Sequence, residues 1–291
     1  MIIEIWTILN PIIRTLIYFT ALYSIGSVLF KVHFYKFFNE EINVYCKKII
    51  RNSALLGFII SILAFLSVAG NLGGEIKSIL EIDLIKLSFE TMQGKSYLLL
   101  IVGFSFLCFS YYFKRIFMNA FNIIGTVIIF ISFIVIGHSL SQGIYTQILL
   151  LIHLFCISYW LGSFLPLRHM CNKKNYKNLY LVAHNFGVYA TFYVGLLVIT
   201  GLTFSYFLLG GILPILTSTY GNVLLCKLLL VSSILMIGAI NKFRIVPKIK
   251  GNLALGQSKL KRSINIEFML TWLILFLTSI LTTTLPTPMG M

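Results

Sequence analysis

The stretch IGHSLSQGIYTQILLLIHLFCISYWLGSFLPL, from Ile136 to Leu167, decides how this chain folds. It lies in a longer segment, residues 116–167, that contains no Lys, Arg, Asp or Glu. A membrane-spanning helix needs about 20 apolar residues, so this segment is too long for one crossing and suits two. The polar and glycine residues between Gly137 and Gly143 are its turn signal. We therefore predict a helical hairpin, in which His138 ends the first arm and His153 lies in the first turns of the second.

The composition of the whole chain agrees with this prediction. Of its 291 residues, 58% are hydrophobic and 11% are charged, whereas soluble domains carry about 25% charged residues. The apolar runs do not alternate with polar residues as the strands of a membrane barrel do. The five cysteines form no CxxC pair, so neither a disulfide framework nor a zinc site is expected. Glu4 stands where a signal peptide would be basic, so we expect no cleaved signal.

The fold class that follows is an all-α polytopic membrane protein with eight transmembrane helices. A more acidic segment, residues 75–95, separates the second helix from the third and is expected to lie on the membrane surface as a partly amphipathic element. We divide the chain into an N-terminal part, residues 1–115, with three helices, and a helical core, residues 116–291, with five. The expected helices cover residues 11–30, 52–72, 96–113, 119–138, 145–167, 180–209, 220–241 and 264–284.

The distribution of basic residues predicts the orientation in the membrane. The net charge of +15 comes from short segments between alternate pairs of helices, which is the pattern of cytoplasmic loops and not of a nucleic-acid-binding surface. Both termini and the hairpin around His138 are therefore expected on the extracytoplasmic side. Five of the 23 Lys and Arg residues lie outside these segments: Arg14, Lys77, Lys86, Lys95 and Lys227.

Two histidines of the hairpin are the first candidates for a metal site. His138 and His153 are expected at the same depth, and an ionisable side chain within a membrane segment suggests function by default. On the second arm His153, Cys156 and Trp160 have the spacing i, i+3, i+7 and share one helix face. Imidazole and thiolate suit a metal such as copper. The alternative is a histidine hydrogen-bonded to a neighbouring helix and a cysteine that packs as a small apolar residue.

Other candidates lie further from this pair. Met289 and Met291, near the C-terminal end, offer two thioethers that could collect Cu(I). His184 lies near the cytoplasmic face, roughly a membrane thickness from the hairpin, and could serve a second, inner site. Arg14, in contrast, is expected to extend to the interface as a long cation near a helix end.

Two charges inside the expected helices have either a structural or a transport role. Lys227 could pair with an extracytoplasmic acid. Glu267 could hand on a cation or a proton, and pairing is the alternative that we favour. The expected partners of Glu267 are Arg262, Arg244 and Lys242.

At these residues the sequence resembles the CopD copper-resistance family. The features that carry the resemblance are Gly-His at the end of one helix and a histidine followed by Trp-x-Gly on the next. In the C-terminal half they include a Thr-Gly pair, a Tyr-Gly pair with a lysine, and an Arg-Ser pair with a glutamate. In this chain they read Gly137-His138, Ile152-His153, Trp160-Leu161-Gly162, Thr200-Gly201, Tyr220-Gly221 with Lys227, Asn241 with Arg244, and Arg262-Ser263 with Glu267. The resemblance covers most of the chain, most closely from Gly137 onward.

The resemblance implies a multi-pass protein of the bacterial inner membrane that moves or delivers copper, together with a separate periplasmic CopC-like copper-binding protein. Copper would be taken up by the extracytoplasmic histidines. The main alternative is a membrane redox protein in which the same two histidines ligate haem b. A scaffold protein that binds neither is the third. No phosphate-binding loop is present, and we expect no enzymatic activity.

Overall fold

The computed structural model describes residues 5–136, 143–173, 178–211 and 213–286, and this part of the chain is helical throughout apart from short connections. Eight of its helices are long and apolar enough to cross a membrane, which confirms the predicted fold class. These helices are α1 (Ile5–Phe34), α2 (Glu40–Gly73), α4 (Met92–Ser110), α5 (Arg115–Ile134), α7 (Ile144–Asn172), α8 (Leu179–Leu209), α10 (Thr219–Ile240) and α12 (Leu253–Thr283).

Several helices are longer than their apolar cores. Residues 31–51 and 242–262, expected as basic loops, are mostly helical: α2 begins at Glu40, η3 (Asn241–Ile245) and α11 (Val246–Gly251) continue α10, and α12 begins at Leu253. Asn39 caps α2 by accepting a hydrogen bond from the Ile42 N–H, and Asn252 caps α12 in the same way. Hydropathy marks the membrane-embedded part of a helix, whereas these polar caps set where it begins.

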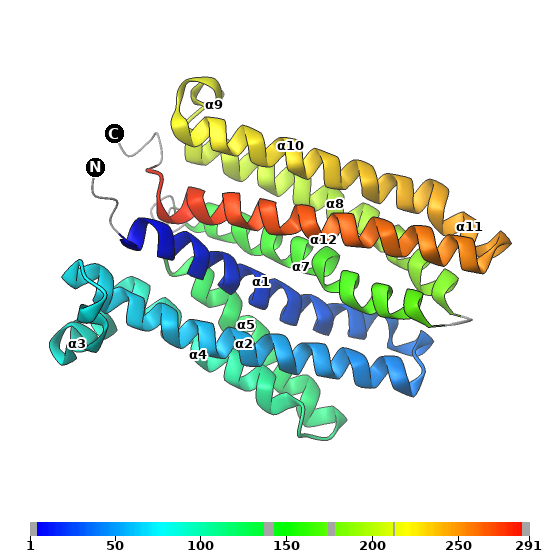
Figure 1. Ribbon diagram of the computed structural model, residues 1–291, viewed down its shortest axis with the longest axis horizontal. Coiled ribbons are helices and arrows are strands. Elements are labelled where there is room, and N and C mark those ends of the chain that lie inside the picture. The colour runs from blue at the N-terminus through cyan, green and yellow to red at the C-terminus, as the bar shows by residue number, and fades with distance from the viewer. Residues whose placement is uncertain (1–4, 137–142, 174–177, 212, 287–291) are drawn as a thin grey trace.

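Four short elements complete the structure. η1 (Tyr35–Phe37) joins α1 to α2, and α9 (Pro214–Thr217) joins α8 to α10. Between α2 and α4, the segment expected to be partly amphipathic forms η2 (Lys77–Leu80) and the nine-residue helix α3 (Ile82–Glu90). Figure 1 shows α3 and α9 at the end of the bundle where α1 begins and α12 ends. We call this end of the bundle the terminal end.

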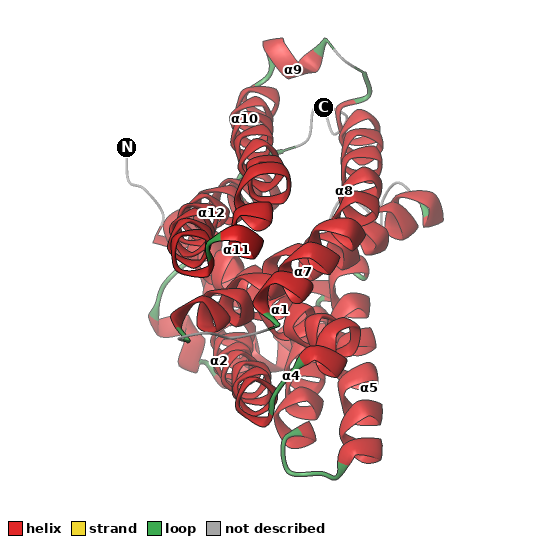
Figure 2. Ribbon diagram, turned by 90° about the vertical axis from the view of Figure 1, so that its right-hand side faces the viewer, coloured by secondary structure: helices red, strands yellow, loops and turns green. Residues whose placement is uncertain are grey.

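Helix α1 lies at the centre of the bundle and packs against α2, α7 and α12 (Figures 1 and 2). Its backbone comes very close to that of α7. A Cβ atom built on Gly26 would lie 2.0 Å from the carbonyl oxygen of Ser158, and one built on Gly162 would lie 1.9 Å from the carbonyl carbon of Gly26. Only glycines allow this approach, which brings α7 into the core between α1 and α8.

The remaining helices form the two sides of the bundle. Helices α2, α4 and α5 pack together on one side, and α8 packs against α7 while α10 packs against α12 on the other (Figure 2). Much of α8 and α10 is exposed at the surface, as expected for helices that face lipid. Polar side chains that lie inside such a bundle are costly to bury, so their positions suggest a function.

Candidate functional site

Two cavities lie one above the other along the bundle. The larger has a volume of about 860 Å³, and residues from all eight long helices line it. Most of these residues come from the half of each helix nearest the terminal end, such as Arg14 on α1, His153 on α7 and Lys227 on α10. The smaller has a volume of about 240 Å³ and lies in the opposite half, between α7, α8, α10 and α12. Leu235 on α10 lines both. We call them the large and the small cavity.

His153 projects from α7 into the large cavity. Its ring lies against Gly201 of α8, where a built Cβ would be 3.0 Å from Cε1 and 3.2 Å from Nδ1. Nδ1 is buried and has no hydrogen-bond partner among the described residues. A ring nitrogen that carries no proton can accept a hydrogen bond or bind a metal ion. Lys227 of α10 lines the same cavity.

The partner expected for His153 is His138, which lies outside the described residues, as do Met289 and Met291. The described part of the chain contains no group of three or more His, Cys, Asp or Glu side chains that could hold a metal ion. A copper ion at His153 would therefore have to take its other ligands from residues that do not form such a group.

The helix face shared by His153, Cys156 and Trp160 does not lead into one site. His153 lines the large cavity and Trp160 lines the small one, two helical turns further along α7. Cys156 is buried and lines neither cavity. Although the three side chains share one helix face, they lie at different heights along the bundle axis and so belong to different surroundings.

Arg14 lies in the wall of the large cavity instead of reaching the interface. Its side chain is 7% exposed, and its guanidinium carbon lies 4.9 Å from the ring centre of Tyr18 and 5.4 Å from that of Phe133. Both distances are typical of cation–π contacts. Helix α1 begins at Ile5, about two turns before Arg14, so the arginine lies deeper in the bundle than the start of the apolar run suggests.

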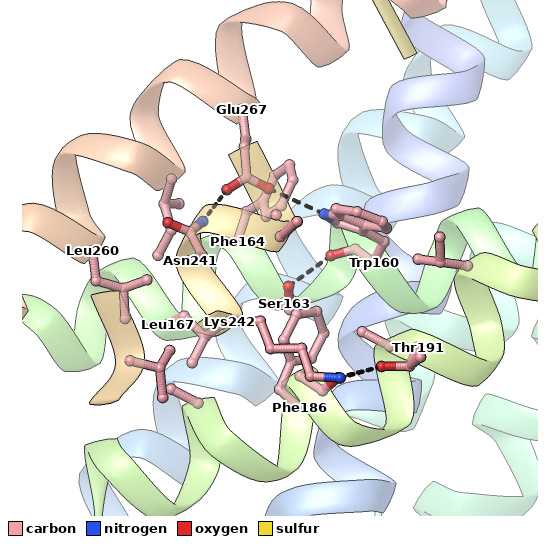
Figure 3. Close-up of a pocket in the computed structure, with 18 of the residues that line it drawn as sticks. Trp160, Ser163, Phe164, Leu167, Phe186, Thr191, Asn241, Lys242, Leu260 and Glu267 are labelled. Atoms are coloured by element: carbon pink, nitrogen blue, oxygen red, sulfur yellow. Dashed lines mark hydrogen bonds between the residues drawn. The ribbon is translucent and has the colours of Figure 1, made fainter. Parts of the chain in front are cut away.

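The carboxylate of Glu267 is the central polar group of the small cavity. Figure 3 shows it between two donors: Trp160 Nε1 donates to Oε2 at 3.2 Å, and Asn241 Nδ2 donates to Oε1 at 2.5 Å. The carboxylate is 3% exposed. These neutral donors take the place of the expected cations Arg262, Arg244 and Lys242. Among the described residues Lys242 donates to the Thr191 hydroxyl and forms no ion pair with Glu267.

Asn241 is a site residue whose local structure the sequence pattern did not indicate. It begins η3, a single stretch of π-helix, and π-helical turns are frequent at functional sites. Its side-chain carbonyl oxygen Oδ1 is buried without a partner in the described structure. The small cavity thus offers a carboxylate and a free carbonyl oxygen, a combination that can accept a proton or a cation.

The remaining candidates lie away from both cavities or lack the expected partner. His184 is exposed on α8, where its ring stacks on that of Tyr180 at 5.6 Å, and it lines neither cavity. Lys227 lines the large cavity but forms no ion pair with an acid among the described residues.

Comparison with known proteins identifies the C-terminal helices. Residues 181–281 match the model of the CopD family, described as copper resistance protein D. This match is shorter than the resemblance described above and covers α8 to nearly the end of α12. Comparison with curated proteins and with solved structures gives no match. The chain is thus a multi-span membrane protein that carries a CopD domain over residues 181–281.

Proposed function

We propose that this protein handles copper by passing it across the membrane through the large and small cavities. The observation that carries the proposal is that α8, α10 and α12, which make up the CopD match, contribute walls to both cavities. The two cavities lie in opposite halves of the bundle and both contact Leu235. Copper is the cargo implied by the family, and the stacked cavities provide a route for it.

Copper would first bind in the large cavity. The unpaired Nδ1 of His153 is a suitable ligand, and His138 is proposed as the second because it ends the other arm of the hairpin. The charge distribution supports an extracytoplasmic position for this cavity, since the basic segments lie toward the opposite end. A separate CopC-like protein in the periplasm would then deliver copper to it, in a bacterial inner membrane.

The small cavity would provide the next binding group. Trp160 follows His153 by two helical turns, about 10 Å along the axis of α7, and donates to Glu267. The Glu267 carboxylate and the free Oδ1 of Asn241 are oxygen acceptors on the cytoplasmic half of this route. Glu267 would accept the cation, or a proton that exchanges with it, before release near the basic ends of α10 and α12.

Haem b is the second candidate ligand of the large cavity. The volume of about 860 Å³ beside an unpaired imidazole nitrogen favours this candidate, because small-molecule sites occupy about 300–1,000 Å³. His153 and His138 would be the residues that hold the haem. The protein would then be a membrane redox protein, and haem would supply the electron-transfer chemistry.

Metal analysis and an absorption spectrum of the purified full-length protein separate these candidates. Copper transport predicts bound copper and no Soret band, and His153→Ala should lower the copper content severalfold. Ile148→Ala is the matched control, because Ile148 is exposed on the same helix and lines neither cavity. A Soret band that is lost in His153→Ala would show that the ligand at His153 is haem and not copper. A protein that binds neither would refute both candidates.

A further inference from the structure

Positive charge faces the large cavity without a compensating acid. Arg14 and Lys227 both line it, and neither Asp nor Glu occurs among the described residues of its wall. Neither cation forms an ion pair in the described part of the chain. The proposed copper contact, His153, is therefore in a cavity whose fixed charges repel a bare cation.

Arg14 is the less exposed of the two cations. Its side chain is 7% exposed, and one terminal nitrogen, NH1, is buried without a hydrogen-bond partner among the described residues. The rings of Tyr18 and Phe133 contact the guanidinium. The polar groups beside it are the neutral hydroxyls of Tyr18 and Tyr97, and no carboxylate pairs with it among the described residues. Burial of a charged group that has only neutral partners and one unpaired donor is unfavourable. An acceptor on a bound molecule would remove this cost.

The rest of the wall indicates what kind of molecule this is. Apolar side chains from α8 and α10 form much of the cavity wall. The volume of about 860 Å³ exceeds what a small inorganic anion needs and falls in the range of organic ligand sites. The apolar residues from these two helices include Leu197, Val198, Leu202, Phe204, Leu228 and Val231.

We propose that the large cavity binds an amphiphilic oxyanion, a molecule with a carboxylate or phosphate head and an apolar body. The head would accept hydrogen bonds from Arg14, whose NH1 has no partner among the described residues. The positive charge of Lys227 in the same wall would attract it, and the body would lie along α8 and α10. A guanidinium and an ammonium are the usual partners of carboxylate and phosphate. A long-chain fatty acid and an anionic phospholipid share this chemistry.

This inference goes beyond the proposed function and does not depend on it, since Arg14 and Lys227 need the anion whether or not copper is carried. It also bears on copper. A bound anion compensates the two positive charges, so that a cation at His153 is no longer repelled by them. Copper and the anion would then bind cooperatively.

Titration of the purified full-length protein in an uncharged detergent, without added copper, tests the inference. The probes are spin-labelled stearate, spin-labelled phosphatidylglycerol and inorganic phosphate, the last as a competitor. Their neutral counterparts are the methyl ester of the same stearate and spin-labelled phosphatidylcholine. The fraction of immobilised probe, measured by electron paramagnetic resonance, reports binding.

The expected result is saturable binding of stearate, phosphatidylglycerol or both, with at least about tenfold preference over the neutral counterpart. Lys227→Met and Arg14→Gln should each weaken this binding by about tenfold or more. Lys248→Gln is the matched control, because it removes one exposed cation at the other end of the bundle. Lys227 is partly exposed, so Lys227→Met keeps the test informative if Arg14→Gln does not fold.

Three results would overturn the inference. Equal binding of charged and neutral probes would show that the cavity does not select an anion. Wild-type affinity of Lys227→Met for the anionic probes would show that Lys227 does not attract the head group. Inorganic phosphate that competes at the same concentration as stearate would show that no apolar body is required.

Discussion

The polar residues inside this bundle differ in how far their hydrogen-bonding capacity is satisfied. Glu267 receives a donor on each carboxylate oxygen, from Trp160 and Asn241. His153 Nδ1 and Arg14 NH1 have no partner in the described structure, and both residues line the large cavity. Satisfied groups hold helices together, whereas unsatisfied ones at a cavity wall are available to a ligand. The small cavity therefore has a fixed carboxylate beside one free acceptor, Asn241 Oδ1, and the large cavity has an open site.

Glu267→Gln is expected to leave the fold nearly as stable as the wild type. The new amide oxygen can accept from Trp160, and its NH₂ group can donate to Asn241 Oδ1 once the Asn241 amide turns over, because that oxygen is free. Glu267→Leu leaves the Trp160 and Asn241 donors without an acceptor, at a cost of about 1–3 kcal/mol for each buried group. Thermal unfolding in detergent measures both variants. Equal loss of stability in the two would contradict this account of the cluster.

At the scale of the elements, the sequence predicted the membrane crossings better than the helix ends and the cavities. Long uncharged runs identify a crossing because the bilayer core admits few charges, and each expected crossing corresponds to one long helix. The polar starts of α2 and α12 depend on Asn39 and Asn252, which hydropathy does not detect. The contact of Trp160 with Glu267 joins residues 107 positions apart. Periodicity within one helix carries no information on such a contact.

The position of Arg14 also shows that a sequence pattern does not report contacts between different helices. A sequence gives its distance from the end of an apolar run but not which neighbouring helices surround it. The structure surrounds it with Tyr18 and Phe133, from two different helices. The sequence indicates Asn241 only through the family resemblance, because a π-helical turn has no pattern comparable to hydrophobic periodicity.

The contact between α1 and α7 should be the packing most sensitive to side-chain size. Gly26→Ala or Gly162→Ala places a methyl group within about 2 Å of the opposite backbone, and overpacking of this kind costs about 1–3 kcal/mol. Each variant should lower the midpoint of thermal unfolding. Gly195→Ala is the control, since a Cβ at Gly195 meets no atom within 4 Å. A wild-type midpoint for Gly26→Ala would contradict the close packing of these helices.

At the scale of the whole molecule, the direction of the proposed copper route depends on which end of the bundle faces the cytoplasm. Eight crossings bring the start of α1 and the end of α12 to the same end (Figure 1). The basic segments lie toward the other end, and positive segments remain in the cytoplasm. The large cavity should therefore lie on the extracytoplasmic side and the small cavity on the cytoplasmic side.

Labelling of single cysteines by a membrane-impermeant maleimide checks this orientation. In a variant without the five native cysteines, Lys77→Cys should react in intact cells, because it precedes α3 at the terminal end. Lys114→Cys, at the opposite end between α4 and α5, should react only after permeabilisation. The reverse pattern would place the large cavity on the cytoplasmic side.

The most direct test of the route is copper flux into proteoliposomes that contain the purified protein. We expect His153→Ala and Glu267→Gln each to lower the initial rate at least about tenfold, because each removes a binding group in one of the two cavities. Ile148→Ala and Met269→Ala should retain the wild-type rate, since both side chains are exposed on the same two helices and line neither cavity. Wild-type flux in both His153→Ala and Glu267→Gln would contradict transport through the two cavities.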